Sequence, residues 1–150
     1  MKRFVLDCSV AAAWCFADEK NAYVDAVLEG FSEGFEALVP PLWVLEVVNV
    51  LALAERRKRL LPAETAHFFE LCSSLPIHLD YALTAVGEHR ELLPLCRAQG
   101  LTAYDAAYLQ TAIRNGIPLA TQDEALRAAC RRCGVVVFAA GTVFTSRLPR

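Results

Sequence analysis

The chain has 150 residues, of which 55% are hydrophobic and 21% are charged, and its formal net charge is -2. This length suits a single domain with one core, and the apolar composition excludes an intrinsically disordered chain. The small net charge excludes a general electrostatic attraction to nucleic acid, so any such binding has to come from a local arrangement of charges.

Short β-like runs alternate with helical patterns along the whole chain. The hydrophobic periodicity and the turn residues predict, in chain order, strand 3–7, helix 10–17, helix 21–32, strand 36–41, helix 42–60, helix 62–75, strand 77–80, helix 83–99, helix 103–115, strand 117–121, helix 122–133 and strand 135–139. Strands separated by helices predict a mostly parallel sheet covered by helices on both faces. We therefore expect an α/β fold with a single domain over residues 1–150.

The apolar segments do not predict export or membrane insertion. The basic start and small-residue run of residues 1–19 look like a secretory signal, but Asp7 interrupts the run where its hydrophobic centre should lie. Residues 37–54 contain two prolines, a glutamate and an asparagine, which disfavour a membrane span. We expect a cytoplasmic protein without a membrane segment.

The cysteines are scattered and fall mainly within apolar helical patterns, which is typical of reduced core thiols: Cys8, Cys15, Cys72, Cys96, Cys130 and Cys133. The pair Cys130 and Cys133 has the spacing of half a zinc site or a redox pair. It falls at the end of a predicted helix just before Gly134, however, and lacks further ligands nearby, so a structural role is favoured.

Four acids occupy positions where a hydrophobic chain would place few charges. Asp7 closes the first predicted strand, Glu46 lies early in the long apolar helix, and Asp105 and Asp123 lie in the first turns of the last two predicted helices. Ligand sites of open parallel sheets form outside the carboxyl ends of the strands. These positions are therefore able to converge on one crevice.

Each helix-start acid also has a structural interpretation. Thr102 with Asp105, and Thr121 with Glu124, match the capping-box pattern, and an acid in a first turn interacts favourably with the helix dipole. Glu46 is harder to explain in this way, because its surroundings are apolar and its one polar neighbour on the same face is Asn49. Asp7 is similarly out of place at the end of a buried strand.

Four carboxylates in one crevice repel each other unless a cation or protons offset their charge. Oxygen ligands from Asp and Glu suit Mg²⁺ or Mn²⁺ better than zinc. Such ions activate water and stabilise the charge that develops on a phosphodiester. The chemistry indicated by the acids is phosphodiester hydrolysis.

Three stretches of the chain resemble the successive motifs of the PIN domain, specifically of the VapC-type toxin ribonucleases of bacterial toxin–antitoxin pairs: VLDCSV, PLWVLEVVNVL and LTAYDAAYLQTAIRNGIPLATQDEAL. The likeness runs from about Arg3 to Phe138. It implies an RNA-cleaving site that holds Mg²⁺ or Mn²⁺ on the four acids Asp7, Glu46, Asp105 and Asp123. It also implies supporting polar residues that orient carboxylates or water: Ser9, Asn49 and Thr121.

The same resemblance implies two protein contacts, a homodimer whose acidic sites lie along a groove and a cognate antitoxin of the VapB type whose C-terminal segment fills that groove. Glu124 stands beside Asp123, and the choice of the acid that faces the metal stays open, although its capping-box position favours a structural role for Glu124.

The run Arg56, Arg57, Lys58 and Arg59 ends the long helix. Arg56, Arg57 and Arg59 are candidates for holding the RNA backbone, and an equally good interpretation is a solvated helix end whose cations interact with the dipole. The histidines share no ligand spacing.

Two other protein classes were considered. A haloacid-dehalogenase-like phosphatase needs a second acid two residues after the first, where this chain has Ser9. A non-catalytic PIN-like module that only binds proteins is the stronger alternative, and it predicts no metal-dependent RNA cleavage.

Overall fold

The structure, a computed structural model, describes residues 2–141. Its helices and strands are, in chain order, β1 (Lys2–Leu6), α1 (Cys8–Ala13), α2 (Ala22–Ser32), β2 (Phe35–Val39), α3 (Leu42–Arg56), α4 (Pro62–Ser74), β3 (Ile77–Leu79), α5 (His89–Gln99), α6 (Ala103–Asn115), β4 (Leu119–Ala120) and α7 (Glu124–Arg132). The strands form one four-stranded sheet in the order β3-β2-β1-β4. Every neighbouring pair in it is parallel.

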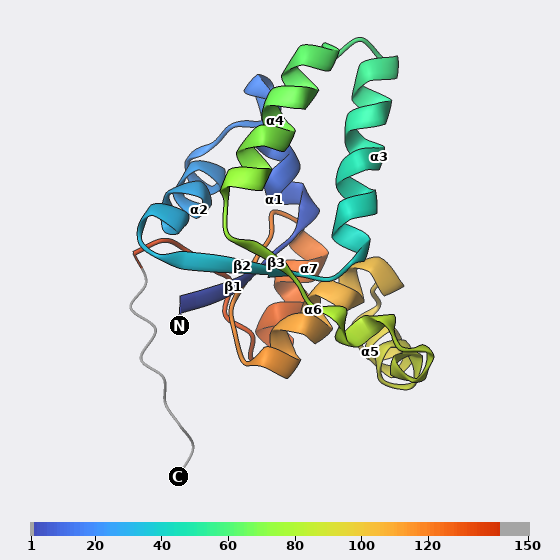
Figure 1. Cartoon of the computed structure of the whole chain (residues 1–150). Coiled ribbons are helices and arrows are strands. Elements are labelled where there is room, and N and C mark those ends of the chain that lie inside the picture. Colours follow the sequence, from blue (N-terminus) through green and yellow to red (C-terminus); the bar gives the residue numbers. More distant parts are fainter. Residues whose placement is uncertain (1, 142–150) are drawn as a thin grey trace.

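The sheet lies between two groups of helices (Figure 1). The first four helices lie on one side, where α3 and α4 rise from the sheet as a long hairpin, and α6 and α7 cover the other side, with α5 packed against α6. The α/β architecture with a parallel sheet flanked on both faces is therefore confirmed.

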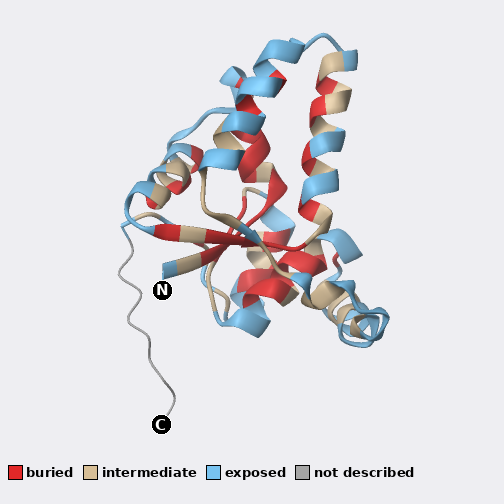
Figure 2. Ribbon diagram, in the orientation of Figure 1, coloured by how far each residue is buried: buried red, intermediate tan, exposed pale blue. Residues whose placement is uncertain are grey.

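The second half of β1 lies in the centre of the core. Phe4, Val5 and Leu6 are fully buried, because helices cover both faces of this inner strand. Figure 2 shows the same pattern in most helices, which bury the face turned towards the core and expose the opposite one, whereas α5 has no buried residue. Phe4 also stacks on Phe138, with ring centroids 4.2 Å apart, and this contact attaches the stretch after α7 to the core.

Several predicted elements are shorter than expected. The first helix covers Cys8–Ala13 in place of the predicted residues 10–17, with Asp7 in the N-cap position. Residues 83–88 were predicted as the start of a helix and fall instead within short 3-10 turns, Tyr81–Thr84 and Val86–Glu88. The predicted strand 135–139 is reduced to a single parallel bridge between Leu119 and Val137.

The long helix ends earlier than its pattern predicted, and the cause is a left-handed residue. Lys58 has a φ of 57°, which stops α3 after Arg56. The Lys58 amide then donates to the carbonyl of Glu55 (2.9 Å) and the Arg59 amide to that of Ala54 (2.8 Å). This bonding is the Schellman pattern of a helix end, with lysine at the position that glycine usually takes. It turns the chain sharply into α4.

Three further predictions concern the chain as a whole. Among the described residues, none of the helices has the length and apolar character to cross a bilayer. All of the cysteines are free, as expected. The assignment of residues 1–150 to one domain stays a prediction, because residues 142–150 lie outside the described part of the chain.

Candidate active site

An open cavity of about 410 Å³ lies at the carboxyl ends of β1 and β4. The four acids singled out in the sequence, Asp7, Glu46, Asp105 and Asp123, all line it. They come from four separate places: the end of β1, the first half of α3, the first turn of α6 and the residue before α7. The convergence follows from the topology, since parallel strands end at the same edge of the sheet.

Asp7 is held in place by the register of β1 and its neighbour β4. Leu6 pairs with Ala120 across β1 and β4, and the Asp7 amide donates to the Ala120 carbonyl at 3.0 Å. This register puts Thr121 beside Asp7, so that its hydroxyl donates to Asp7 Oδ2 at 2.6 Å. The Ser9 hydroxyl donates to the same oxygen at 2.7 Å. Asp7, which is only 4% exposed, is thus a buried carboxylate with two hydroxyl donors.

The two hydroxyls are themselves fixed by backbone amides. Ser9 Oγ accepts from the Gln122 amide (3.1 Å), and Thr121 Oγ1 accepts from the Asp123 amide (3.1 Å). Because each hydroxyl has one proton, accepting from an amide leaves that proton for Asp7. The loop after β4 therefore sets the direction in which both hydroxyls donate.

Gln122 extends this network and was not predicted. Its side-chain amide donates to the Ser9 carbonyl at 3.0 Å, and its Oε1 accepts from Asn21 Nδ2 at 2.8 Å. Gln122 also lines the cavity. The sequence carried one usable signal for it, its position between two polar residues expected at the site, Thr121 and Asp123.

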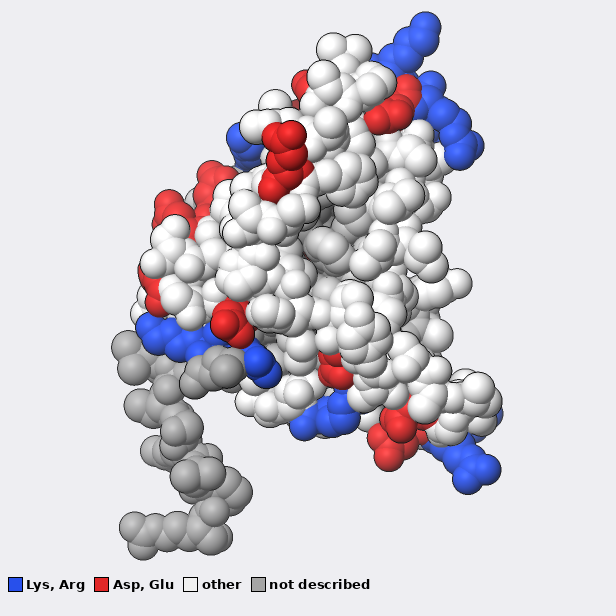
Figure 3. Space-filling view, in the orientation of Figure 1, with Lys and Arg blue, Asp and Glu red and all other residues white. Residues whose placement is uncertain are grey.

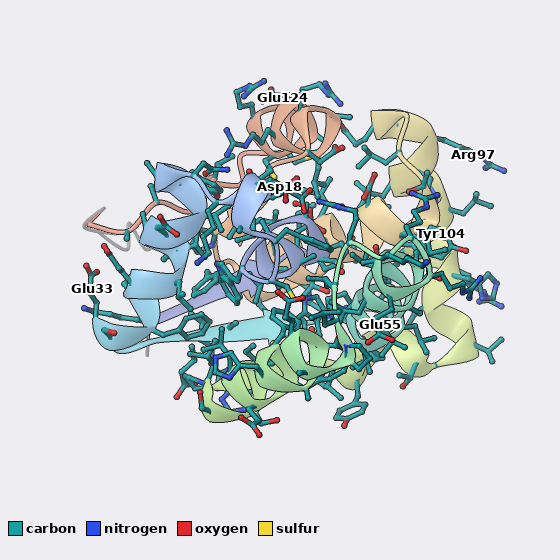
Figure 4. The ribbon with its side chains drawn as sticks, turned by 90° about the horizontal axis from the view of Figure 1, so that it is seen from above. Asp18, Glu33, Glu55, Arg97, Tyr104 and Glu124 are labelled. Carbon is teal, nitrogen blue, oxygen red and sulfur yellow. The ribbon has the colours of Figure 1, made fainter. Side chains whose placement is uncertain are left out.

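Asp123 both caps a helix and faces the cavity. Its Oδ1 accepts from the Leu126 amide at 2.7 Å, which makes Asp123 the N-cap of α7. The predicted capping box between Thr121 and Glu124 is wrong, because the Thr121 side chain bonds to Asp7 and the Asp123 amide instead. Both acids are exposed, but Glu124 does not line the cavity and lies at the edge of the molecule in Figure 4. Of these two adjacent acids, the structure turns Asp123 to the cavity.

Glu46 is held by a tyrosine that the sequence analysis did not single out. The hydroxyl of Tyr108, a fully buried residue of α6, donates to Glu46 Oε1 at 2.8 Å. This bond ties α3 to α6 across the site. Tyr108 lies three residues after Asp105 and so shares its face of the helix, which was the available signal.

Asp105 lies in the first turn of α6, and its amide donates to Thr102 Oγ1 at 3.2 Å. Thr102 is therefore the N-cap of the helix, which is the role that the predicted capping box gave it. The Asp105 side chain is half-buried at the cavity.

Burial and mutual repulsion both favour the neutral form of Asp7, Glu46 and Asp105. Burial raises the pKa of Asp7, and the hydrogen bonds from Thr121 and Ser9 oppose this effect. Burial is also the main reason why the pKa of Glu46 is raised, and the charges of Asp7 and Asp105 add to it. The pKa of Asp105 is raised by burial and then by the charges of Asp123 and Asp7. The acids interact electrostatically as one group.

A divalent cation fits this group by charge and by ligand type. A cation would offset the repulsion that raises the pKa values, and carboxylate oxygens are the ligands that Mg²⁺ and Mn²⁺ prefer. As the side chains stand, no three His, Cys, Asp or Glu residues between positions 2 and 141 lie close enough together to hold an ion.

The remaining predicted residues divide into two groups. Ser9 lines the cavity, and Thr121 is buried against Asp7, whereas Asn49 is exposed on α3 and does not line the cavity. In the basic run, Arg59 lines the cavity, and Arg56 and Arg57 are exposed at the end of α3 without lining it.

Comparison with known proteins places this fold and site in a family. The family model described as PIN domain matches residues 4–132. The chain belongs to the PIN-domain family. This family has a nuclease-like fold, and its members are generally metal-dependent nucleases.

Among solved structures, the PIN domain described here is similar to the crystal structure of PAE2754 from Pyrobaculum aerophilum, with a TM-score of 0.64 and 25% sequence identity. The match covers 91% of this chain and 83% of that chain. A comparison with curated proteins found no match.

Proposed function

We propose that this PIN domain is an endoribonuclease that depends on Mg²⁺ or Mn²⁺ and acts as a toxin of the VapC type. The observation that carries the proposal is the convergence of four carboxylates, Asp7, Glu46, Asp105 and Asp123, on one cavity at the carboxyl ends of β1 and β4. The family supports nuclease chemistry, and the choice of RNA rests on the resemblance of the sequence motifs.

The four acids would hold the divalent ion. When bound, such an ion activates water for attack and stabilises the charge that develops on the phosphodiester. Ser9 and Thr121 fix the rotamer of Asp7 by donating to its Oδ2, and this rotamer also sets the direction of Oδ1. Tyr108 does the same for Glu46. Asn49 stays a predicted supporting residue, for orienting water or a carboxylate from the exposed side of α3.

Two protein partners belong to the same proposal, a second copy of the chain and a cognate antitoxin of the VapB type. The exposed apolar residues Val44, Leu45 and Val48 on α3, with Leu93 on α5, support a protein contact. The face shown in Figure 3 has few charged side chains between α3 and α5, with Lys and Arg at its periphery. A cytoplasmic location is the setting that this function requires.

Cleavage of RNA by the purified protein tests the proposal. We expect cleavage that stops with EDTA and returns when Mg²⁺ or Mn²⁺ is added in excess. Asp7→Asn, purified identically, should lose the activity while keeping the melting temperature within a few degrees of the parent, which excludes a contaminating nuclease. An Asp7→Asn protein with full activity would overturn the assignment.

Growth inhibition tests the toxin role separately. Expression of the chain should arrest growth, and Asp7→Asn and Asp105→Asn should relieve the arrest. Co-expression of a small reading frame adjacent to the gene, encoding a DNA-binding protein, should relieve it as well. If growth stops regardless of both substitutions and no RNA is cleaved, the chain is a protein-binding PIN-like module.

A further inference from the structure

The basic run at the end of α3 is not one surface. Arg56 and Arg57 are exposed and do not line the acidic cavity, whereas Arg59, three residues after Arg56, does. Of the described residues that line the cavity, Arg59 is the one with a positive charge. The four residues of the run are adjacent in sequence, so a specific reason must direct Arg59 to the cavity.

The backbone of the α3–α4 turn supplies that reason. The left-handed conformation of Lys58 ends the helix, and the Arg59 amide donates back to the Ala54 carbonyl at 2.8 Å. Leu60, the next residue, is buried. Arg59 is therefore anchored on both sides, by a helix-terminating hydrogen bond and by a core residue.

The side chain is positioned by contacts with the stretch that follows α1. Its guanidinium lies over the Phe16 ring, 4.2 Å from the centroid. Its Nη2 lies 3.1 Å from both oxygens of Asp18 and 3.7 Å from Glu19 Oε2. In the view from above, Asp18 lies towards the middle of the molecule (Figure 4). Phe16 and Asp18 thus hold the plane of the guanidinium in one orientation.

These contacts leave much of the guanidinium available. All of the acidic contacts use Nη2, and within residues 2–141 neither Nε nor Nη1 of Arg59 donates a hydrogen bond. The side chain is 43% exposed, and that of Asp18 is 75% exposed. An ion pair this exposed contributes little to folding stability. The arrangement is better explained by binding than by stability.

A phosphate is the ligand that this arrangement fits. The planar guanidinium offers parallel donors that match phosphate oxygens, and stacking on an aromatic ring preserves its charge and donors. The carboxylates inside the cavity repel the nucleic-acid backbone, and a cation at the rim would offset part of this repulsion in addition to the divalent ion of the proposed function.

We propose that Arg59 binds a backbone phosphate of the RNA next to the one that is cleaved, with Phe16 and Asp18 positioning its side chain. This inference rests on the proposed ribonuclease function. It assigns to one arginine a contact that the sequence distributes over Arg56, Arg57 and Arg59.

Binding of a short, fluorescein-labelled single-stranded RNA, measured by anisotropy in Mg²⁺ with Asp7→Asn as the non-cleaving parent, tests the proposal. Adding Arg59→Ala should weaken binding about 10- to 100-fold, the range of a hydrogen bond to a charged group. It should also reduce the slope of log Kd against log salt by about 0.7, the loss of one phosphate contact on a single strand. Arg59→Lys keeps the charge but loses the parallel donors of the guanidinium. Its affinity for the RNA should therefore lie between that of the Asp7→Asn parent and that of the variant with Arg59→Ala.

Arg56→Ala is the matched comparison, because it removes the same charge from the same run outside the cavity. It loses only a screened, long-range attraction, so we expect an effect of about twofold or less. Asp18→Asn, which loosens Arg59 without removing it, should weaken binding less than Arg59→Ala does. Equal effects of Arg59→Ala and Arg56→Ala would overturn the proposal, as would unchanged binding by Arg59→Ala.

Kinetics in the otherwise native chain separate this inference from the proposed function. Arg59→Ala should raise KM for RNA more than it lowers kcat, whereas Asp7→Asn lowers kcat. If the native chain cleaves no RNA, the proposed function fails, and the anisotropy comparison still decides whether Arg59 binds a phosphate. If RNA is cleaved and Arg59→Ala has native KM, the inference about Arg59 alone fails.

Discussion

The two sides of the acidic cavity are built differently. On the strand side, Asp7 is buried and accepts two hydroxyl hydrogen bonds, from Ser9 and Thr121, whose own orientations are set by backbone amides. On the helix side, Glu46 and Asp105 are half-buried, and a single bond from Tyr108 orients Glu46. The strand side is therefore preformed, and the helix side has more freedom to adjust.

This difference has a functional consequence. Residues that converge through strand register cannot move without disrupting the sheet, whereas side chains on helix faces can change rotamer at little cost. We infer that the Asp7 side chain keeps one position, and that the Glu46 and Asp105 side chains change rotamer when an ion and substrate bind. Substitutions on the two sides should therefore have effects of different size.

The largest effect among the predictions is expected from Asp123→Asn. The amide oxygen of Asn still caps α7 by accepting from the Leu126 amide, so the helix should form normally. The charge at the cavity is lost, and kcat/KM for RNA should fall by more than about 100-fold. This loss is larger than the one expected for residues that only orient the metal-binding side chains.

Glu124→Gln is the matched control for Asp123→Asn, since it neutralises the adjacent acid, which is exposed and outside the cavity. It should retain native kcat/KM. A comparable loss of activity in Glu124→Gln would mean that the wrong acid has been assigned to the cavity.

A smaller effect is expected on the strand side from Thr121→Val, which keeps the side-chain shape and removes the hydroxyl. Asp7 loses a donor and the Asp123 amide loses its acceptor, so kcat/KM should fall about 10- to 100-fold. Stability should fall by about 1–3 kcal/mol, the cost of an unsatisfied buried group, in urea unfolding.

Thr111→Val provides the comparison. Thr111 is also fully buried, but its hydroxyl donates to the Ala107 carbonyl within α6, remote from the acids. This variant should keep its activity. If both valine variants lose activity equally, general loosening of the fold, rather than the Asp7 network, explains the result.

On the helix side, Tyr108→Phe should reduce kcat/KM by about tenfold, at the lower end of the outer-shell range. The hydrogen bond from Tyr108 lowers the pKa of Glu46, so its loss raises that pKa further and moves the acid limb of the pH–rate profile to higher pH. Tyr104→Phe, on the exposed side of the same helix, should leave the profile in place. An unmoved acid limb in Tyr108→Phe would contradict the positioning role.

The smallest effect is expected from Asp105→Asn, on the folding stability of the metal-free protein. The folded state raises the pKa of Asp105 above its ordinary value of 3.8, so its charge destabilises the fold at neutral pH and this cost disappears as the pH falls below both values. Asp105→Asn should therefore raise the melting temperature in EDTA at pH 7. The gain should shrink as the pH falls towards 4.

Asp25→Asn is the control for this measurement, because Asp25 is exposed in the first turn of α2, where its charge favours the helix dipole. Neutralising it should lower the melting temperature slightly. A decrease in the melting temperature of Asp105→Asn at pH 7 would show that the charge of Asp105 does not destabilise the metal-free protein.

Much of the fold and the set of four acids could be predicted from the sequence. Alternating apolar runs and helix caps determine local structure, and a carboxylate in an apolar helix, such as Glu46, is conspicuous because its burial is costly. The errors in the bounds of the first helix, at residues 83–88 and at residues 135–139 occurred where local signals were weak and tertiary contacts decided the conformation.

What the tertiary structure alone decided is the pairing of groups that are distant in the chain. The register of β1 and β4 brings Thr121 to Asp7, the packing of α3 on α6 brings Tyr108 to Glu46, and the turn at Lys58 separates Arg59 from its neighbours in the basic run. Sequence patterns report which face or turn a residue occupies. Which side chain it meets depends on register and packing angles, which arise only when the whole core assembles.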